Sequence, residues 1–161
     1  MTIRNISNRA VLLLGGIVVG LLLFSAQPLL AASEGCGLLK PADLTGLLGG
    51  TPNAKPNAGA CTWTVPGTSR KLVATKLKAT GKTAKMEFAA SRNGAAKSGK
   101  IVNDEAGLGD KAFASLESYG VALMMLKKGR VLQLQYWTGA AGTAKDMDTL
   151  RPIAKKAIAA F

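Results

Sequence analysis

The segment Gly107-Leu108-Gly109-Asp110-Lys111-Ala112 has the G-x-G-x-x-A spacing of a dinucleotide-binding turn. In such a turn a hydrophobic strand precedes the glycines and a helix follows them, so that the helix N-terminus holds the pyrophosphate. The preceding segment, KIVNDEA, has few apolar residues, and the following segment, FASLESYG, is too short for a crossover helix. Asp110 would also present a carboxylate to the phosphates. We therefore predict no nucleotide cofactor here, but a tight turn in which Gly107 and Gly109 take positive φ and Asp110 binds backbone N–H groups.

Two sets of residues have the types that bind metals, but neither has the spacing. Asp104, Glu105 and Asp110 offer carboxylates for Ca²⁺ without the alternating D-x-D-x-D-G order of a calcium loop. Cys36 and Cys61 have no further Cys and no His to complete a zinc set. We expect the acidic segment to be a solvated loop and predict no metal site.

No set of residues in the sequence indicates a catalytic centre. The chain has no histidine, which removes the usual general base of serine and cysteine nucleophiles. The serine segments SRNGAAK and SLESYG do not match the S-x-x-K motif of a Ser-Lys system. Two carboxylates can hydrolyse glycosides without histidine, but no pattern singles out two of the nine acids. We predict that the protein is not an enzyme, with a hydrolase that uses carboxylates as the lowest-ranked alternative.

Cys36 and Cys61 are predicted to form a disulfide. No C-x-x-C motif suggests redox activity, and two thiols in an exported protein usually pair. A Cys36–Cys61 bridge would close a loop of about 25 residues and stabilise the fold by roughly 3 kcal/mol.

The N-terminus has the pattern of a secretory signal. Arg4 and Arg9 precede the uncharged segment AVLLLGGIVVGLLLFSA, and Pro28 and small residues follow it. This order predicts a signal peptide at 1–33 with cleavage before Glu34. The alternative is an uncleaved anchor in the inner membrane, because residues 10–32 carry no charge and are long enough to span a bilayer. Both interpretations place the rest of the chain outside the cytoplasm, in the periplasm or in the extracellular space.

Residues 34–161 are predicted to form one domain, since 128 residues suffice for a single hydrophobic core. We expect no lipid anchor. The box Leu30-Ala31-Ala32 is followed by Ser33 and not by cysteine, and Cys36 follows Glu34 and Gly35.

The chain is strongly basic, with 21 Lys and Arg, nine Asp and Glu, and a formal net charge of +12. Residues 34–161 hold 19 of these basic residues and all nine acids, an excess of 10 positive charges. Such a field attracts anionic polymers or membrane surfaces, and it also keeps a protein soluble. Nucleic-acid binding would require exposed aromatic side chains, but aromatic residues make up only 5%. Trp63, Tyr119 and Tyr136 lie on predicted strand faces, and Trp137 is the one candidate for an exposed ring. We predict no nucleic-acid partner.

Hydrophobic periodicity predicts seven elements and the loops between them. Residues 51–60 and 94–112 are predicted loops, and a further short strand is expected near 113–117. The strand at 119–127 is apolar on both faces, which indicates a central strand. The strand at 130–137 alternates, with Leu132, Leu134 and Tyr136 expected to face the core and Gln133 and Gln135 to face out. Pro152 should kink the last helix or mark its start. The elements are helices at 37–49, 83–93 and 145–160 and strands at 61–65, 71–77, 119–127 and 130–137. This order predicts an α+β fold, in which an antiparallel sheet of about four to five strands packs against N-terminal, middle and C-terminal helices.

Several segments together resemble a known class of proteins. CGLLKPADLTGLLGG, ACTWTV, GLGDKAF, the apolar hairpin and the C-terminal Ala/Lys helix are similar to those of small exported bacterial proteins, often lipoproteins, whose domain has no assigned function. The resemblance covers most of residues 34–161. It implies the Cys36–Cys61 disulfide and an α+β fold, and it brings no catalytic residues. The chain departs from the lipoprotein members because it has no lipobox cysteine.

The sequence therefore predicts an exported, non-enzymatic binding or interaction module of the bacterial cell envelope. Its partner would be an envelope protein or a small ligand, and an anionic envelope polymer or membrane surface is the alternative. A membrane would otherwise be contacted only through an uncleaved N-terminal segment. The candidate binding residues are Gly107, Gly109, Asp110, Lys111 and Trp137.

Overall fold

The computed structural model describes residues 35–161, so the predicted signal peptide or anchor at 1–33 lies outside the described residues. The elements, in chain order, are η1 (Cys36–Leu38), α1 (Pro41–Leu48), β1 (Asn53–Asn57), β2 (Ala60–Thr64), β3 (Lys71–Thr80), α2 (Gly81–Lys97), β4 (Val102–Asp104), β5 (Lys111–Glu117), β6 (Gly120–Lys127), β7 (Arg130–Trp137) and α3 (Ala144–Ala160).

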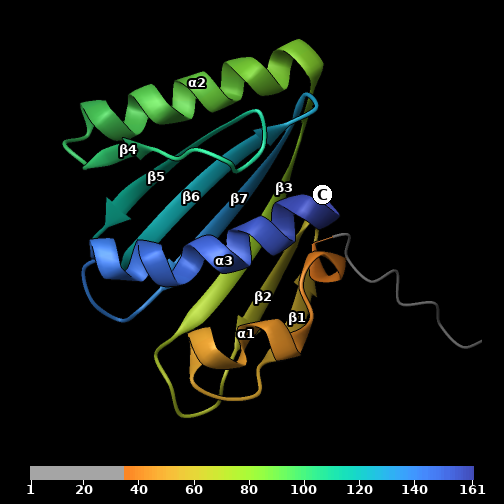
Figure 1. Ribbon diagram of the computed structural model, residues 1–161, viewed down its shortest axis with the longest axis vertical. Coiled ribbons are helices and arrows are strands. Elements are labelled where there is room, and N and C mark those ends of the chain that lie inside the picture. Colours follow the sequence, from red (N-terminus) through yellow and green to blue (C-terminus); the bar gives the residue numbers. More distant parts are fainter. Residues whose placement is uncertain (1–34) are drawn as a thin grey trace, which may run out of the picture.

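All seven strands form one antiparallel sheet in the order β1-β2-β3-β7-β6-β5-β4. Helix α2 covers one face, while η1, α1 and α3 lie on the other, which gives three layers (Figure 1). The predicted α+β fold is confirmed, although the sheet has more strands than the four to five expected. The central position predicted for the strand at 119–127 is also confirmed, since β6 lies between β5 and β7 with both faces covered.

The larger core lies between the sheet and the layer of η1, α1 and α3. Alternate residues of β7 enter it, as predicted for Leu132, Leu134 and Tyr136, which are all buried. The smaller core lies under α2 and includes Phe88 and Val131. The two faces of β7 therefore point toward two different hydrophobic cores, and neither face is open to solvent along its whole length.

The Cys36–Cys61 disulfide predicted from the sequence is present and joins η1 to β2. The Cα atoms of the two residues are 4.9 Å apart, and Cys61 is fully buried. A second connection ties the same layers, because the Tyr136 hydroxyl donates to the Leu47 carbonyl oxygen at 3.1 Å. The disulfide thus fixes η1 to the sheet, and the buried hydrogen bond fixes α1 to it.

The structure corrects four local predictions. Residues 53–57 form the edge strand β1 despite Pro56, which an edge strand tolerates because one side of it needs no ladder bonds. The predicted loop 94–112 contains β4, and α2 continues past the expected stop at Asn93 to Lys97. Pro152 does not mark the start of the last helix, because α3 begins at Ala144 and continues through Pro152, whose side chain is exposed. No helix within residues 35–161 has the length and apolarity needed to cross a bilayer.

Candidate functional site

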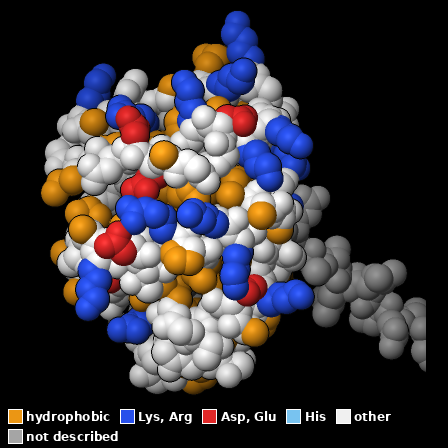
Figure 2. All heavy atoms as spheres, viewed as in Figure 1, with side chains coloured by type: hydrophobic (Ala, Val, Ile, Leu, Met, Phe, Trp, Pro, Cys, Tyr) orange, Lys and Arg blue, Asp and Glu red, His pale blue; other side chains and the backbone are white. Residues whose placement is uncertain are grey.

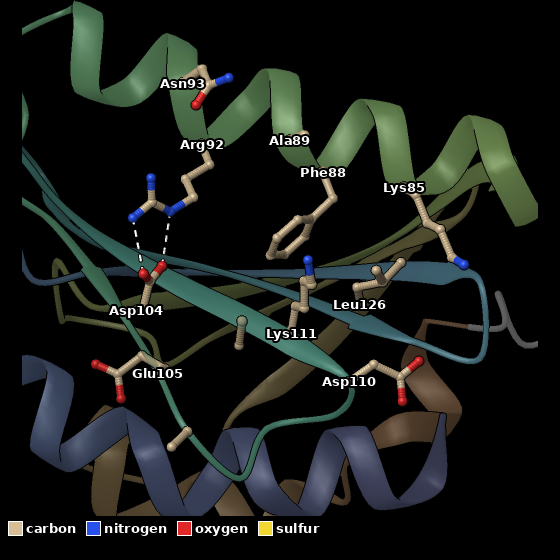
Figure 3. A pocket seen from close by; sticks show the side chains of 12 residues that line it. Lys85, Phe88, Ala89, Arg92, Asn93, Asp104, Glu105, Asp110, Lys111 and Leu126 are labelled. Carbon is tan, nitrogen blue, oxygen red and sulfur yellow. Dashed lines mark hydrogen bonds and ion pairs between the residues drawn. The ribbon is translucent and has the colours of Figure 1, made fainter.

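A hollow of about 740 Å³ lies between α2 and the loop that joins β4 to β5. We call it groove A and define it by six of its lining residues, Lys85, Phe88, Arg92, Asp104, Lys111 and Leu126 (Figure 3). Its volume falls within the range of small-molecule sites in proteins. It also contains two residues of the predicted binding loop, Asp110 and Lys111.

One side of α2 forms the upper wall of groove A. Lys85, Phe88, Ala89 and Arg92 follow the spacing i, i+3, i+4, i+7, which places them along one stripe of a helix. Phe88 points from this stripe toward the strands (Figure 3). Together with Leu126 of β6 it makes an apolar floor, because the two side chains are only 6% and 4% exposed.

The loop at 105–110 forms the lower wall and is held by short bonds. Leu108 is fully buried and anchors the loop in the larger core. The Asp110 N–H donates to the Leu126 carbonyl oxygen, and the Asp110 carboxylate accepts the Lys128 N–H, both at 2.7 Å. Gly107 and Gly109 have φ of 74° and 86°. The predicted tight turn, with Asp110 bound to a backbone N–H, is therefore present.

The structural context of a dinucleotide turn is not met at this segment. Residues 111–117, which follow the glycines, form strand β5, where that turn requires a helix. Gly109 serves the packing of the loop instead, since a Cβ there would lie 2.6 Å from the Leu126 carbonyl oxygen.

Three of the six charged side chains that line groove A are already in ion pairs. Arg92 binds Asp104 through two hydrogen bonds of 2.8 and 3.0 Å. This contact lowers the pKa of Asp104 and raises the pKa of Arg92. Glu105 is bound by Arg151 of α3 at 2.8 and 3.2 Å, and these hydrogen bonds raise the pKa of Arg151. Both acids at the end of β4 are thereby neutralised by arginines.

Two lysines of groove A remain available for a ligand. Lys85 and Lys111 form no ion pair with any carboxylate in residues 35–161. Both extend into the space between α2 and the strands (Figure 3). The nearby carboxylates are Asp104, which attracts Lys111 without forming an ion pair with it, and Asp110, one of whose oxygens is held by the Lys128 N–H. The groove thus combines an apolar floor with two unpaired ammonium groups.

Trp137 does not belong to this site. It pairs with Gly120 in the sheet, whereas Lys111 pairs with Leu126. Six residues of β6 separate the two pairs, about 20 Å at the rise of a β-strand. The Trp137 ring is only partly exposed, because it stacks on Tyr119 at 3.8 Å and Lys71 lies 3.8 Å above it. The structure therefore separates Trp137 from the other four candidate residues.

The helix side of groove A was not predicted as a site. The sequence predicted a helix at 83–93, but gave no reason to bring Lys85 or Arg92 near the glycine loop. That proximity depends on how α2 crosses the sheet, which is a long-range property. The available signal was the i, i+3, i+7 spacing of Lys85, Phe88 and Arg92 around a single aromatic residue.

The residues of groove A can bind a ligand through charged and amide side chains. Its polar groups are lysine, arginine, asparagine and carboxylate side chains. Within residues 35–161, no three Cys, Asp or Glu side chains are grouped so that they could hold a metal ion. Basic side chains are spread over the face of the molecule that Figure 2 shows, so that an approaching anion meets a positive field.

Comparison with protein-family models, with curated proteins and with solved structures gives no match for this chain.

Proposed function

We propose that this protein is an exported binding module of the bacterial cell envelope and that groove A holds a small organic anion with an apolar body. The observation that carries the proposal is the position of Lys85 and Lys111 above the buried floor of Phe88 and Leu126. A carboxylate or phosphate would bind the ammonium groups, while an attached chain or ring would cover the floor.

The charge balance favours an anion over a cation. Asp104 and Glu105 already bind arginines, so they offer little to a cationic ligand. The excess of 10 positive charges in residues 34–161 adds a long-range attraction for anions. The proposed role is capture and release, with no chemical step, in line with the resemblance to exported proteins without catalytic residues.

Export is part of the proposal and rests on two observations. The first is the n-region, apolar segment and small-residue site in the sequence of residues 1–33. The second is the Cys36–Cys61 disulfide, a feature typical of proteins outside the cytoplasm. Mass spectrometry of protein exported by its own signal tests this. The expected mass is that of residues 34–161 less two hydrogens, and a full-length mass with free thiols would contradict export with cleavage.

The ligand class is tested by nuclear magnetic resonance titration with octanoate, octyl phosphate and octanol. We expect the two anions to shift the amide signals of residues 85–92 and 110–112, and octanol to shift them much less. An equal response to octanol, or shifts elsewhere only, would contradict the proposal.

The alternative is an electrostatic binder of anionic polymer that uses the lysine excess without groove A. Dextran sulfate serves as the probe for it. Under the alternative, this polymer shifts signals next to lysines over the whole surface, and binding weakens steeply between low and high salt. Under the proposal, octanoate binding depends less on salt because part of it comes from burial of the apolar chain.

A further inference from the structure

A second hollow, of about 370 Å³, lies on the other side of α2. We call it groove B and define it by Ser91, Gly94, Ser115, Glu117, Gln133 and Gln135. Its helix wall consists of Ser91, Gly94, Ala95 and Ser98, which again follow the spacing i, i+3, i+4, i+7. These side chains are small, and a Cβ added at Gly94 would meet no atom within 4 Å.

The floor of groove B is polar where a helix-covered sheet is normally apolar. Gln133 and Gln135 of β7 face α2, while Leu132 and Leu134 point into the opposite core. Under the N-terminal half of α2, the same sheet face carries apolar residues such as Leu126 and Val131. Polar side chains under a helix indicate a binding site, because each must find hydrogen bonds to offset its desolvation and a ligand can supply them.

A buried polar network closes one end of groove B. The Ser115 hydroxyl donates to Glu117 at 2.7 Å, and Lys100 binds the second Glu117 oxygen at 2.7 Å. Ser115 and Glu117 are 3% and 8% exposed. Both carboxylate oxygens of Glu117 therefore have a partner, and the ion pair of Glu117 with Lys100 has no net charge. Groove B therefore carries no unpaired charge, in contrast to groove A.

Hydrogen-bonding capacity remains unused along the floor. The Gln133 amide makes no hydrogen bond with the rest of residues 35–161, and Gln135 makes one long bond of 3.5 Å to the Tyr119 hydroxyl. An amide side chain offers two donors and an acceptor with two lone pairs. The floor thus presents both donors and acceptors to a ligand that has many of each.

Apolar surface lies beside these groups. Met124 and the Tyr119 ring line groove B, and Tyr119 is held in place by stacking on Trp137 with ring centroids 3.8 Å apart. A sugar ring combines hydroxyl groups on its edges with C–H faces that pack on such surfaces. From the unpaired amides, the neutral lining and the volume, we propose that groove B binds a neutral saccharide of one or two rings.

The test is a nuclear magnetic resonance titration of the exported protein with glucose, cellobiose and N,N′-diacetylchitobiose. At least one of them should shift the backbone amides of residues 133 and 135, the side-chain amides of both glutamines, and the amides of residues 94–98. No shift of these signals up to the highest soluble concentration of any of the three sugars would overturn the proposal.

Two variants make the assignment specific. Gly94→Phe fills the hollow without removing a polar group, and we expect it to weaken binding at least tenfold. Gly94→Ala is the control, because a methyl group leaves space in the groove and favours the helix. Gln133→Leu should also weaken binding at least tenfold, because the amide lost is one that faces the sugar. Unchanged saccharide affinity in both Gly94→Phe and Gln133→Leu would overturn the assignment.

Saccharide binding in groove B is independent of anion binding in groove A. Octanoate should not shift the amides of residues 94–98, 133 and 135, and the saccharides should not shift those of Lys85 or Lys111. Failure of either proposal is therefore seen in its own set of signals.

Discussion

Phe88 of α2 and Phe113 of β5 pack edge to face, with ring centroids 5.2 Å apart and an interplanar angle of 71°. Phe88 lines groove A and Phe113 lines groove B, so this contact forms the wall between the two hollows. It also fixes the height of α2 above the sheet, since both rings belong to the smaller core.

Replacement of this anchor should destabilise the protein. We expect Phe88→Ala to lower the free energy of unfolding by about 3 kcal/mol, because the side chain is 6% exposed and its removal leaves a cavity. Met86→Ala on the same helix is the control, since Met86 is 63% exposed, and it should change the free energy by less than about 0.5 kcal/mol. Urea denaturation measures both. Equal effects would show that α2 is not held by Phe88.

The two glycines of the loop should differ in their tolerance of alanine. Both have positive φ, which costs alanine about 1 kcal/mol. A Cβ at Gly107 meets nothing within 4 Å, whereas one at Gly109 lies 2.6 Å from the Leu126 carbonyl oxygen. Gly109→Ala should therefore be the less stable variant in thermal denaturation and should shift the Lys128 amide signal. If Gly107→Ala is equally unstable, the close approach at Gly109 is not what constrains the loop.

The disulfide should contribute about 3 kcal/mol to the free energy of unfolding. It joins two residues that are 25 positions apart in the sequence, so it closes a loop and holds η1 against β2. The double variant Cys36→Ala/Cys61→Ala should therefore unfold at lower denaturant concentration than the oxidised protein. Treatment with a reductant should destabilise the wild type by a similar amount and leave the double variant unchanged. A wild type that is insensitive to reductant would argue against this contribution.

The ion pair of Arg92 and Asp104 should make stability depend on acid pH. Arg92 lowers the pKa of Asp104 below its ordinary value of 3.8, so the folded state holds the proton less tightly than the unfolded state. The stabilisation is therefore present above pH 3.8 and is lost as the pH falls through the lowered pKa.

Asp104→Asn removes this titration and serves as the comparison. The melting temperature of the wild type should exceed that of Asp104→Asn at pH 6, and the difference should shrink below pH 3.8. The effect should be small, because the pair is exposed. Glu87→Gln is the control, since Glu87 has no ion-pair partner in residues 35–161. A difference in melting temperature between the wild type and Asp104→Asn that stays constant with pH would show that this ion pair does not cause the pH dependence.

The fold was largely predictable because its signals are local. The β6–β7 hairpin alternates cleanly, and the two cysteines had no other role to fill. Strands β1 and β4 were missed for a physical reason. They are the two edges of the sheet, where Pro56 and polar side chains are tolerated because one side of each strand is open.

The sites were predictable only in part. The glycine loop was recognised as a tight turn, and two of its residues line groove A. The contribution of α2 to groove A was not predicted. The order of residues along the chain does not say which side of a helix faces a distant loop. Gln133 and Gln135 were predicted to face away from the core, and they do, but they lie half-buried beside α2 in groove B rather than in open solvent.

The most direct test of the central claim is calorimetric titration of octanoate into the wild type and two double variants. Lys85→Gln/Lys111→Gln removes the ammonium groups of groove A, while Lys78→Gln/Lys97→Gln removes the same charge outside both grooves. The account predicts that the first variant binds about tenfold more weakly, a change of about 1.4 kcal/mol, and that the second binds like the wild type. Equal affinity in all three proteins, or no binding to the wild type, would contradict it.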